Sequence, residues 1–229
     1  MLYFYNVYSL VMNKYLFCLW LSLLIVMCVI LYNRIEIELD DRQYMTIADV
    51  LSNCDTGDLI VFRWYKQDAG HRLFSKYSHV GLVVKVDNHV KVLELHPEGE
   101  YKDYPSGVYL HNLRERVTTY PGPCYFAKLQ VNKEHLQSVL QNNLHTYRQI
   151  KFNDNFRNTF VLNTLKKLIG KSITLDQNTM FCSQFIGKIL LDSGFINCNI
   201  AELSPESITQ LKYNDSNTYL FGKLYSIYF

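Results

Sequence analysis

An 18-residue apolar run constrains this chain more than any other feature of its sequence. Residues 15–32 carry 17 apolar side chains, and Ser22 is the exception. At about 1.5 Å per residue, a helix of this length spans roughly 27 Å, close to the hydrocarbon thickness of a bilayer. All of its backbone polar groups would be satisfied within the helix. We therefore predict one transmembrane helix over 15–32, which makes the lipid bilayer a partner and the protein a single-pass membrane protein.

Two other interpretations of the run stay open. A cleaved signal peptide has a shorter apolar core, of about 7–15 residues, followed by small residues at the cleavage site. No such site follows Leu31, where the chain reads Tyr-Asn-Arg-Ile-Glu-Ile-Glu-Leu. The second alternative is a buried helix of a soluble domain, since the run is apolar on every side. Lys14 and Arg34 bracket the run and leave its orientation in a bilayer undetermined.

The rest of the chain has the size of a single domain. We divide the sequence into an N-terminal segment 1–14, the anchor 15–32, a juxtamembrane connector 33–50 and a folded domain 51–229. About 195 residues follow the apolar run, which is enough for one domain with a sizeable core. The chain has 23 basic and 21 acidic residues. This near-neutral balance argues against a nucleic-acid partner.

Hydrophobic spacing predicts a domain of mixed strands and helices. The clearest element is a β-hairpin, because residues 79–86 and 89–96 are short, rich in β-branched side chains and separated by Asp87-Asn88. Together the elements indicate an α+β domain in which an antiparallel sheet packs on helices. The other predicted strands are 59–64, 124–131 and 219–229, and the predicted helices are 43–53, 133–147, 160–169, 179–193 and 204–212.

The predicted hairpin has a register that brings polar residues together. If Asp87 and Asn88 form the loop, Gly81 faces Glu94 and His79 faces His96. Side chains of this parity share one face of a sheet, so His79, Glu94 and His96 project to the same side. Gly81 would leave open space beside Glu94 on that face. A three-residue loop would reverse the parity.

Cys182 has the strongest case for chemistry among the six cysteines. It lies within Phe-Cys-Ser-Gln-Phe, residues 181–185, in the first turn of the helix predicted over 179–193. Backbone N–H groups and the positive end of a helix dipole stabilise a thiolate there, and a thiolate attacks carbonyl carbon. The alternative is a buried structural thiol. The chain has no C-x-x-C pair, so neither a disulfide framework nor a structural zinc site is expected.

A nucleophilic cysteine needs a base, and His79 beside Glu94 fits this requirement. A carboxylate next to an imidazole fixes its tautomer and stabilises the imidazolium. The structural alternative makes Glu94 a solvated strand residue and His79 a surface residue at a strand end. A third possibility is a metal site formed by His79, His96 and Glu94, because imidazoles and a carboxylate suit zinc.

The order of these motifs resembles a known family. Residues 57–62 (Gly-Asp-Leu-Ile-Val-Phe), 78–81 (Ser-His-Val-Gly), Glu94 on the next strand and 181–185 opening a helix occur in sequence. This order resembles the circularly permuted papain-like branch of the NlpC-type hydrolases, the YiiX/YaeF-like branch. That branch includes proteins of poxviruses and other large DNA viruses. The resemblance covers about residues 50–225.

The resemblance implies a permuted papain-like fold with a catalytic site. Matched residue by residue, Cys182 is the nucleophile, His79 the base and Glu94 the orienting group. The reaction implied is thiol-mediated cleavage or transfer at an amide or ester bond of a peptide or lipid, through a thioester and without cofactor or metal. In a viral protein, the membrane would be a host or viral one. The alternative is a catalytically silent, membrane-tethered binding or structural protein, for example of a virion.

Overall fold

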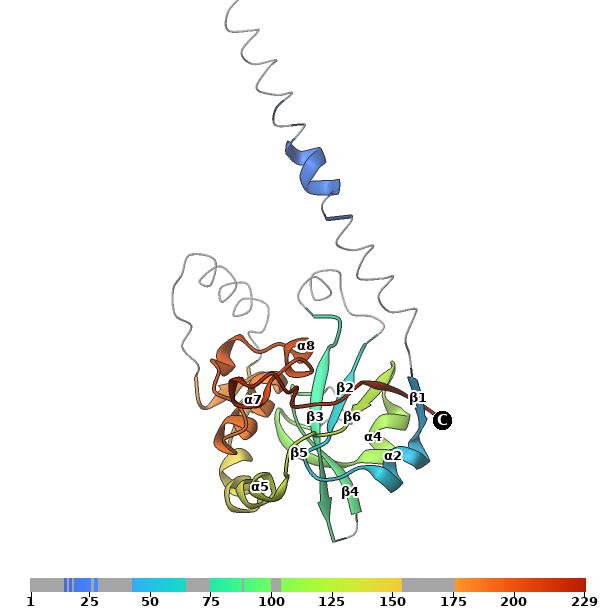
Figure 1. The fold of residues 1–229 in the computed structure, drawn as a ribbon, viewed down its shortest axis with the longest axis vertical. Helices are drawn as coiled ribbons and strands as arrows, with labels where there is room; N and C mark the ends of the chain where they lie inside the picture. Colours follow the sequence, from blue (N-terminus) through green and yellow to red (C-terminus); the bar gives the residue numbers. More distant parts are fainter. Residues whose placement is uncertain are drawn as a thin grey trace, which may run out of the picture. The chain divides into compact units, whose positions relative to one another are not determined.

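The fold of this chain is known from a computed structural model, which describes residues 15, 17, 19–25, 27–28, 43–64, 75–87, 89–99, 104–153 and 176–229. The chain divides into two compact units, residues 1–42 and residues 43–229, and each is considered by itself. The second unit is a mixed fold of sheet and helices (Figure 1).

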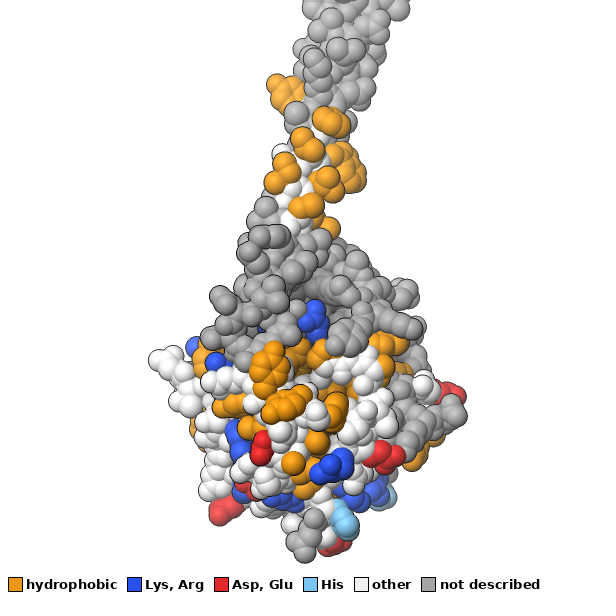
Figure 2. All heavy atoms as spheres, turned by 90° about the vertical axis from the view of Figure 1, so that its right-hand side faces the viewer, with side chains coloured by type: hydrophobic (Ala, Val, Ile, Leu, Met, Phe, Trp, Pro, Cys, Tyr) orange, Lys and Arg blue, Asp and Glu red, His pale blue; other side chains and the backbone are white. Residues whose placement is uncertain are grey.

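The structure corrects the predicted transmembrane helix over 15–32. Its described residues are helical and carry exposed apolar side chains (Figure 2). In the part of the chain that the structure describes, no helix is both long and apolar enough to cross a membrane. The fold class predicted with this helix is therefore corrected to a mixed fold of sheet and helices. The lipid-bilayer partner and the membrane location stay predictions.

A seven-stranded sheet forms the centre of the second unit. Its strand order is β1-β9-β6-β2-β3-β4-β5. The β1–β9 pair is parallel, and the other neighbouring pairs are antiparallel. The sheet is therefore mixed, where a purely antiparallel sheet was expected. Its strands are β1 Gln43–Thr46, β2 Leu59–Phe62, β3 His79–Val86, β4 His89–His96, β5 Gly107–Asn112, β6 Cys124–Ala127 and β9 Tyr225–Tyr228.

Strands β3 and β4 form the predicted hairpin in the predicted register. Leu82 pairs with Leu93 and Val86 pairs with His89. This is the register expected when a two-residue loop joins the strands. Asp87 has a φ of 47°, the left-handed conformation that the first loop residue of such a hairpin adopts. The parity argument for His79 and Glu94 is thereby confirmed.

The helices agree with prediction where apolar spacing is regular. The helix predicted over 133–147 is confirmed, and the one predicted over 179–193 is confirmed from Cys182 onward, because Thr179 and Met180 form a short strand. The helix over 204–212 is shorter than expected, and the one over 160–169 lies outside the described residues. The helices are α2 Ile47–Asn53, α4 Leu113–Thr119, α5 Glu134–Tyr147, α7 Cys182–Asp192 and α8 Pro205–Ile208. Shorter elements are the 3-10 turns η1 Ile200–Glu202 and η2 Tyr213–Asp215 and the parallel pair β7 Lys151–Phe152 and β8 Thr179–Met180.

The segment predicted as one helix over 43–53 is a strand followed by a helix. Thr46 ends β1 and caps α2, since its Oγ1 accepts a hydrogen bond of 3.0 Å from the Asp49 backbone N–H. The Asp49 carboxylate in turn accepts from the Thr46 backbone N–H at 3.3 Å. This reciprocal capping box sets the start of the helix at Ile47.

Two hydrophobic cores lie on opposite faces of the sheet. Side chains alternate along each strand, so Val80 and Leu82 point to one face and Val83 to the other. The core containing Val80 and Leu82 includes residues of α5 and α7. The core containing Val83 includes Phe62 and residues of α2 and α4. Figure 1 shows α5 and α7 on one side of the sheet and α2 and α4 on the other.

Candidate functional site

The structure brings His79 and Glu94 together across the hairpin. Nε2 of His79, the first residue of β3, lies 2.7 Å from Oε2 of Glu94 on β4. Both residues are buried, with exposed fractions of 2% and 0%. The alternatives of a solvated carboxylate and of a surface histidine are therefore wrong for this pair.

Arg116 completes a buried cluster with these two residues. Its Nε donates to Glu94 Oε1 at 2.8 Å and its Nη2 donates to Glu94 Oε2 at 3.1 Å. It lies on the buried side of α4 together with Leu113 and Val117. No sequence pattern singled out Arg116. The available signal was the spacing of 113, 116 and 117, which puts an arginine within the apolar stripe of a short helix.

The cluster holds Glu94 ionised and so defines the tautomer of His79. Burial raises the pKa of Glu94, but the hydrogen bond from His79 and the positive charge of Arg116 outweigh it and lower that pKa to about 2. An ionised carboxylate can only accept hydrogen bonds, so His79 donates from its Nε2–H. In the neutral ring, Nδ1 is then the basic nitrogen.

Aromatic side chains pack around the cluster. The Phe62 ring lies 5.4 Å from the His79 ring, measured between centroids. The guanidinium carbon of Arg116 lies 4.8 Å from the Phe62 ring centroid and 5.2 Å from that of Tyr120. The Tyr120 hydroxyl is 2.9 Å from the Ser78 hydroxyl, next to His79 in the chain. These contacts restrict the rotamers of both Arg116 and His79.

Cys182 is the first residue of α7, as predicted, and 5% of it is exposed. Hydrogen bonds anchor the turn around it, since the Ser183 hydroxyl donates to the Leu203 carbonyl at 2.6 Å. The Gln184 side chain accepts from the Phe181 backbone N–H at 3.0 Å. The helix start is therefore firmly fixed to the rest of the second unit.

Cys182 and the His79–Glu94 pair are associated with different hydrophobic cores of the second unit. Cys182 packs in the core that contains Val80 and α7. His79 packs against Phe62, which belongs to the core on the α4 face. Alternation along β3 gives the same assignment, because His79 and Val80 point to opposite faces. The structure thus joins His79 to Glu94, whereas contact of Cys182 with this pair and a catalytic role for the three together stay predictions.

His96 pairs with His111 rather than with Glu94. The two Nε2 atoms lie 3.2 Å apart, and Nδ1 of His96 lies 2.9 Å from the Pro97 carbonyl oxygen. The carbonyl can only accept, so Nδ1 of His96 donates to it, and Nε2 of His96 accepts from His111. Burial lowers the pKa of His111 to about 4, which keeps this ring neutral near pH 7.

This arrangement does not fit the metal site considered for His79, His96 and Glu94. Both carboxylate oxygens of Glu94 are already engaged, by His79 and by Arg116. Among the residues that the structure describes, no group of three or more histidine, cysteine or carboxylate side chains could hold a metal ion.

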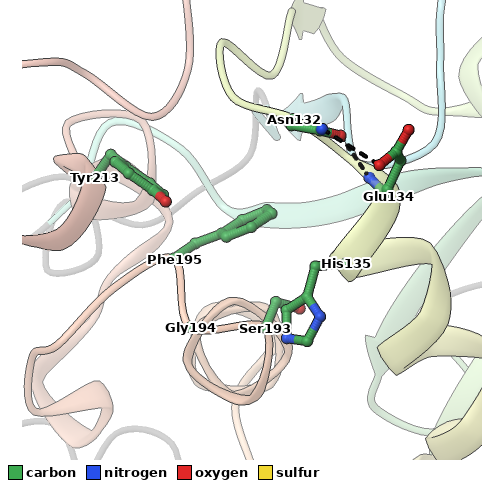
Figure 3. Close-up of a pocket in the computed structure, with 7 residues that line it drawn as sticks. All are labelled: Asn132, Glu134, His135, Ser193, Gly194, Phe195 and Tyr213. Carbon is green, nitrogen blue, oxygen red and sulfur yellow. Dashed lines mark hydrogen bonds between the residues drawn. The ribbon is translucent and has the colours of Figure 1, made fainter.

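A pocket of about 440 Å³ lies apart from these residues (Figure 3). It opens between the start of α5, the end of α7 and η2. The Glu134 backbone N–H donates to Asn132 Oδ1 at 2.9 Å at its rim. None of the predicted site residues contributes to its wall. The residues that line it are Asn132, Glu134, His135, Ser193, Gly194, Phe195 and Tyr213.

Comparisons with known proteins find a likeness in structure only. No family model matches the chain, and no curated protein matches it. Among solved structures, the chain is similar to the crystal structure of the metalloprotein YiiX from Escherichia coli O157:H7. The TM-score is 0.42, with 16% identity over 61% of this chain and 66% of that chain, just under two thirds of its length. A likeness of this degree carries no argument about activity or metal content, and the resemblance to the YiiX/YaeF-like branch stays an expectation from the order of the motifs.

Proposed function

We propose that this chain is a thiol hydrolase or acyltransferase that acts on an amide or ester bond of a peptide or lipid. Cys182 is the nucleophile, His79 the base and Glu94 the orienting carboxylate. The proposal is carried by the hydrogen bond of 2.7 Å between His79 and Glu94, which is shielded from water. An imidazole held in one tautomer by a buried carboxylate is the arrangement that activates a thiol for attack.

The reaction divides into two acyl transfers. Nδ1 of His79 takes the proton from the Cys182 thiol, and the thiolate forms a bond to the substrate carbonyl carbon. Collapse of the tetrahedral intermediate breaks the bond to the leaving amine or alcohol, which receives the proton from His79. Water or another acceptor then gives a proton to His79 and attacks the thioester carbon. The C–S bond breaks, the acid or transferred acyl product leaves, and the Cys182 sulfur takes the proton back from His79. Glu94 stabilises the imidazolium in both halves.

The reaction requires the Cys182 sulfur within about 3–4 Å of the His79 ring, although catalytic contacts are often longer before substrate binds. In the described conformation the two side chains pack on opposite faces of the sheet. Each is the first residue of its element, Cys182 of α7 and His79 of β3. A local rearrangement at one of these two starts is therefore part of the proposal.

The same separation favours a second candidate, a catalytically silent protein with a binding or structural role. In that case His79, Glu94 and Arg116 form a buried ion-pair network whose task is to hold β3, β4 and α4 together. Such networks fix a unique arrangement of elements in some proteins without any catalytic function.

Thiol reactivity separates the two candidates. An activated Cys182 should react with iodoacetamide at pH 7 faster than the exposed Cys198, although Cys182 is buried. Mass spectrometry of the alkylated peptides gives both rates in one sample. His79→Ala should slow the reaction of Cys182 and leave that of Cys198 unchanged.

Ester hydrolysis provides the second measurement. The enzyme candidate predicts that the purified protein hydrolyses p-nitrophenyl acetate and that Cys182→Ala abolishes this activity. Cys198→Ala is the matched control and should retain it. If Cys182 reacts no faster than Cys198, and Cys182→Ala and wild type behave alike, the silent candidate holds.

A further inference from the structure

Arg116 and His79 both contact the carboxylate of Glu94 inside the buried cluster. Glu94 and Arg116 are 0% and 1% exposed, so their charges are shielded from solvent. Glu94 carries one negative charge, because its pKa is lowered to about 2, and Arg116 carries one positive charge at any accessible pH. A proton added to His79 would place a second positive charge beside Arg116 on the same carboxylate, in a region of low dielectric, which is unfavourable.

We propose that Arg116 is the positioning residue of this site, since its guanidinium balances Glu94 and keeps His79 neutral with the proton on Nε2. The inference rests on the proposed function, because it assigns to Arg116 the preparation of the base. A buried carboxylate alone would draw a second proton onto the imidazole. With Arg116 in place, His79 can still accept the proton of a thiol on Nδ1.

The geometry of Arg116 also directs the carboxylate. Its two N–H donors bind both oxygens of Glu94, which fixes the carboxylate plane. Oε2 is shared between Arg116 and Nε2 of His79, at 3.1 Å and 2.7 Å. The rings of Phe62 and Tyr120 flank the guanidinium and hold it in place. Arg116 therefore sets both the charge and the orientation of the group that His79 contacts.

Other titratable groups on this face do not replace the charge of Arg116. His96 from β4 and His111 from β5 share a hydrogen bond that fits neutral rings, and burial lowers the pKa of His111 to about 4. Burial raises the pKa of the Cys124 thiol from β6 to about 12, so this thiol is also neutral. Ser78 and Tyr120 contribute hydroxyl groups only. Among the described residues, Arg116 is therefore the permanent positive charge in contact with Glu94.

Arg116→Met is the substitution that tests this role. Methionine retains an apolar stem between Phe62 and Tyr120 but lacks the charge. The cluster should then regain balance by taking up a proton on His79, which moves the midpoint of the His79 titration upward by about 1–3 pH units. Arg116→Lys keeps the charge and should leave the midpoint near that of wild type. Arg114→Met removes an exposed arginine from the same helix and is the matched control.

The titration is read by NMR on the full chain labelled with ¹⁵N and ¹³C histidine. His79→Gln assigns the signal. Wild type should show a neutral ring with the proton on Nε2 at pH 7, and Arg116→Met an imidazolium at the same pH. The acid limb of the pH profile for ester hydrolysis should shift in the same direction in Arg116→Met and should not move in Arg114→Met.

The outcomes separate this inference from the proposed function. If Arg116→Met folds and its His79 titrates as in wild type, the inference is wrong. If that variant does not fold, the double variant Arg116→Met, Glu94→Gln removes both charges. The midpoint of the His79 titration in this double variant should be no higher than in wild type. A higher midpoint there would also overturn the inference. If the titration shifts as expected but wild type hydrolyses no ester, Arg116 has the role proposed and the enzyme function fails.

Discussion

Glu94 couples the stability of the second unit to pH, because it is a buried carboxylate with a pKa of about 2 against an ordinary value of 4.5. A carboxyl group whose folded pKa lies below its unfolded pKa stabilises the fold above the unfolded value. That contribution is lost as pH falls through the folded value. We therefore expect the free energy of unfolding to decline between about pH 5 and pH 2. Glu94→Gln should lack this decline and should cost about 3–5 kcal/mol at pH 7, since Arg116 loses the buried carboxylate that it binds.

Urea denaturation at a series of pH values between 7 and 3 measures this effect. Glu98→Gln is a suitable control, because it removes an exposed carboxylate just after the end of β4. A Glu94→Gln variant that loses stability with falling pH as steeply as wild type would show that Glu94 does not control the decline.

His111 should make a separate contribution to the pH dependence of stability, at a higher pH than Glu94. Burial lowers its pKa to about 4 in the folded protein, compared with an ordinary value of 6.5. The unfolded chain binds the proton more tightly, so stability is complete above the unfolded value and falls as pH drops through the folded value. His111→Gln should flatten the stability profile between about pH 6.5 and pH 4. The prediction fails if the denaturation midpoint of this variant still falls over that interval as it does in wild type.

The sequence identified His79 and Glu94 as neighbouring residues of the candidate site, but it did not identify Arg116. A two-residue loop fixes the register of a hairpin, and register fixes which side chains share a face. Arg116 belongs to helix α4, which was not among the helices predicted from apolar spacing. An arginine on the apolar side of a helix is ordinarily expected to reach solvent. Parity also does not tell which helix will cover a given face. For this reason the sequence could not show that α7, with Cys182, packs on the face opposite to His79.

At the scale of elements, Gly81 determines how closely β3 and β4 approach beside the pair. An added Cβ would lie 2.6 Å from Val92 Cγ2 and 3.0 Å from the Leu93 carbonyl oxygen. The open space expected beside Glu94 is therefore wrong, because atoms of β4 fill it. Gly81→Ala should cost about 1–3 kcal/mol through overpacking. Gly107→Ala, where the nearest atom is 3.5 Å away, is the control and should change stability by less than about 0.5 kcal/mol.

Thermal or urea unfolding of the two alanine variants measures the difference. Equal stabilities for Gly81→Ala and Gly107→Ala would show that the hairpin adjusts to the added methyl group. In that case the packing between β3 and β4 does not restrain Glu94.

Element prediction succeeded where one periodicity dominates a segment and failed where two elements meet. Helices α5 and α7 have an apolar face over several turns, and the hairpin has β-branched strands around a turn pair. Residues 43–53 combine a four-residue edge strand with a helix. Thr46 and Asp49 form the capping box at the boundary, but in the sequence these two residues are easily taken for the interior of one longer helix. Strand β5 and helix α4 follow each other without a turn, which hides both periods.

At the scale of the whole second unit, β9 joins its two ends. It lies between β1 and β6, and β9 is the strand with which β1 pairs. Its Ile227 is buried in the core on the α4 face, and Tyr228 packs edge to face on Tyr44. Pairing of the chain's last strand with the first strand of the unit is a long-range contact. No local pattern in the sequence predicts such a contact, although a closing strand over 219–229 was expected.

Deletion of residues 223–229 should therefore destabilise the unit far more than its seven residues suggest. Without β9, strand β1 loses its neighbour and the edge of β6 opens to solvent, so we expect the melting temperature to fall by roughly 10 °C or more. A synthetic peptide of residues 223–229 should restore part of the loss by adding a strand to the open edge. Deletion of residues 1–42, which form a separate unit, is the control and should shift the melting temperature by less than about 3 °C. If circular dichroism shows both truncated chains melting together with the intact protein, the sheet is stable without β9, and its stability comes from the hairpin and the helices around it.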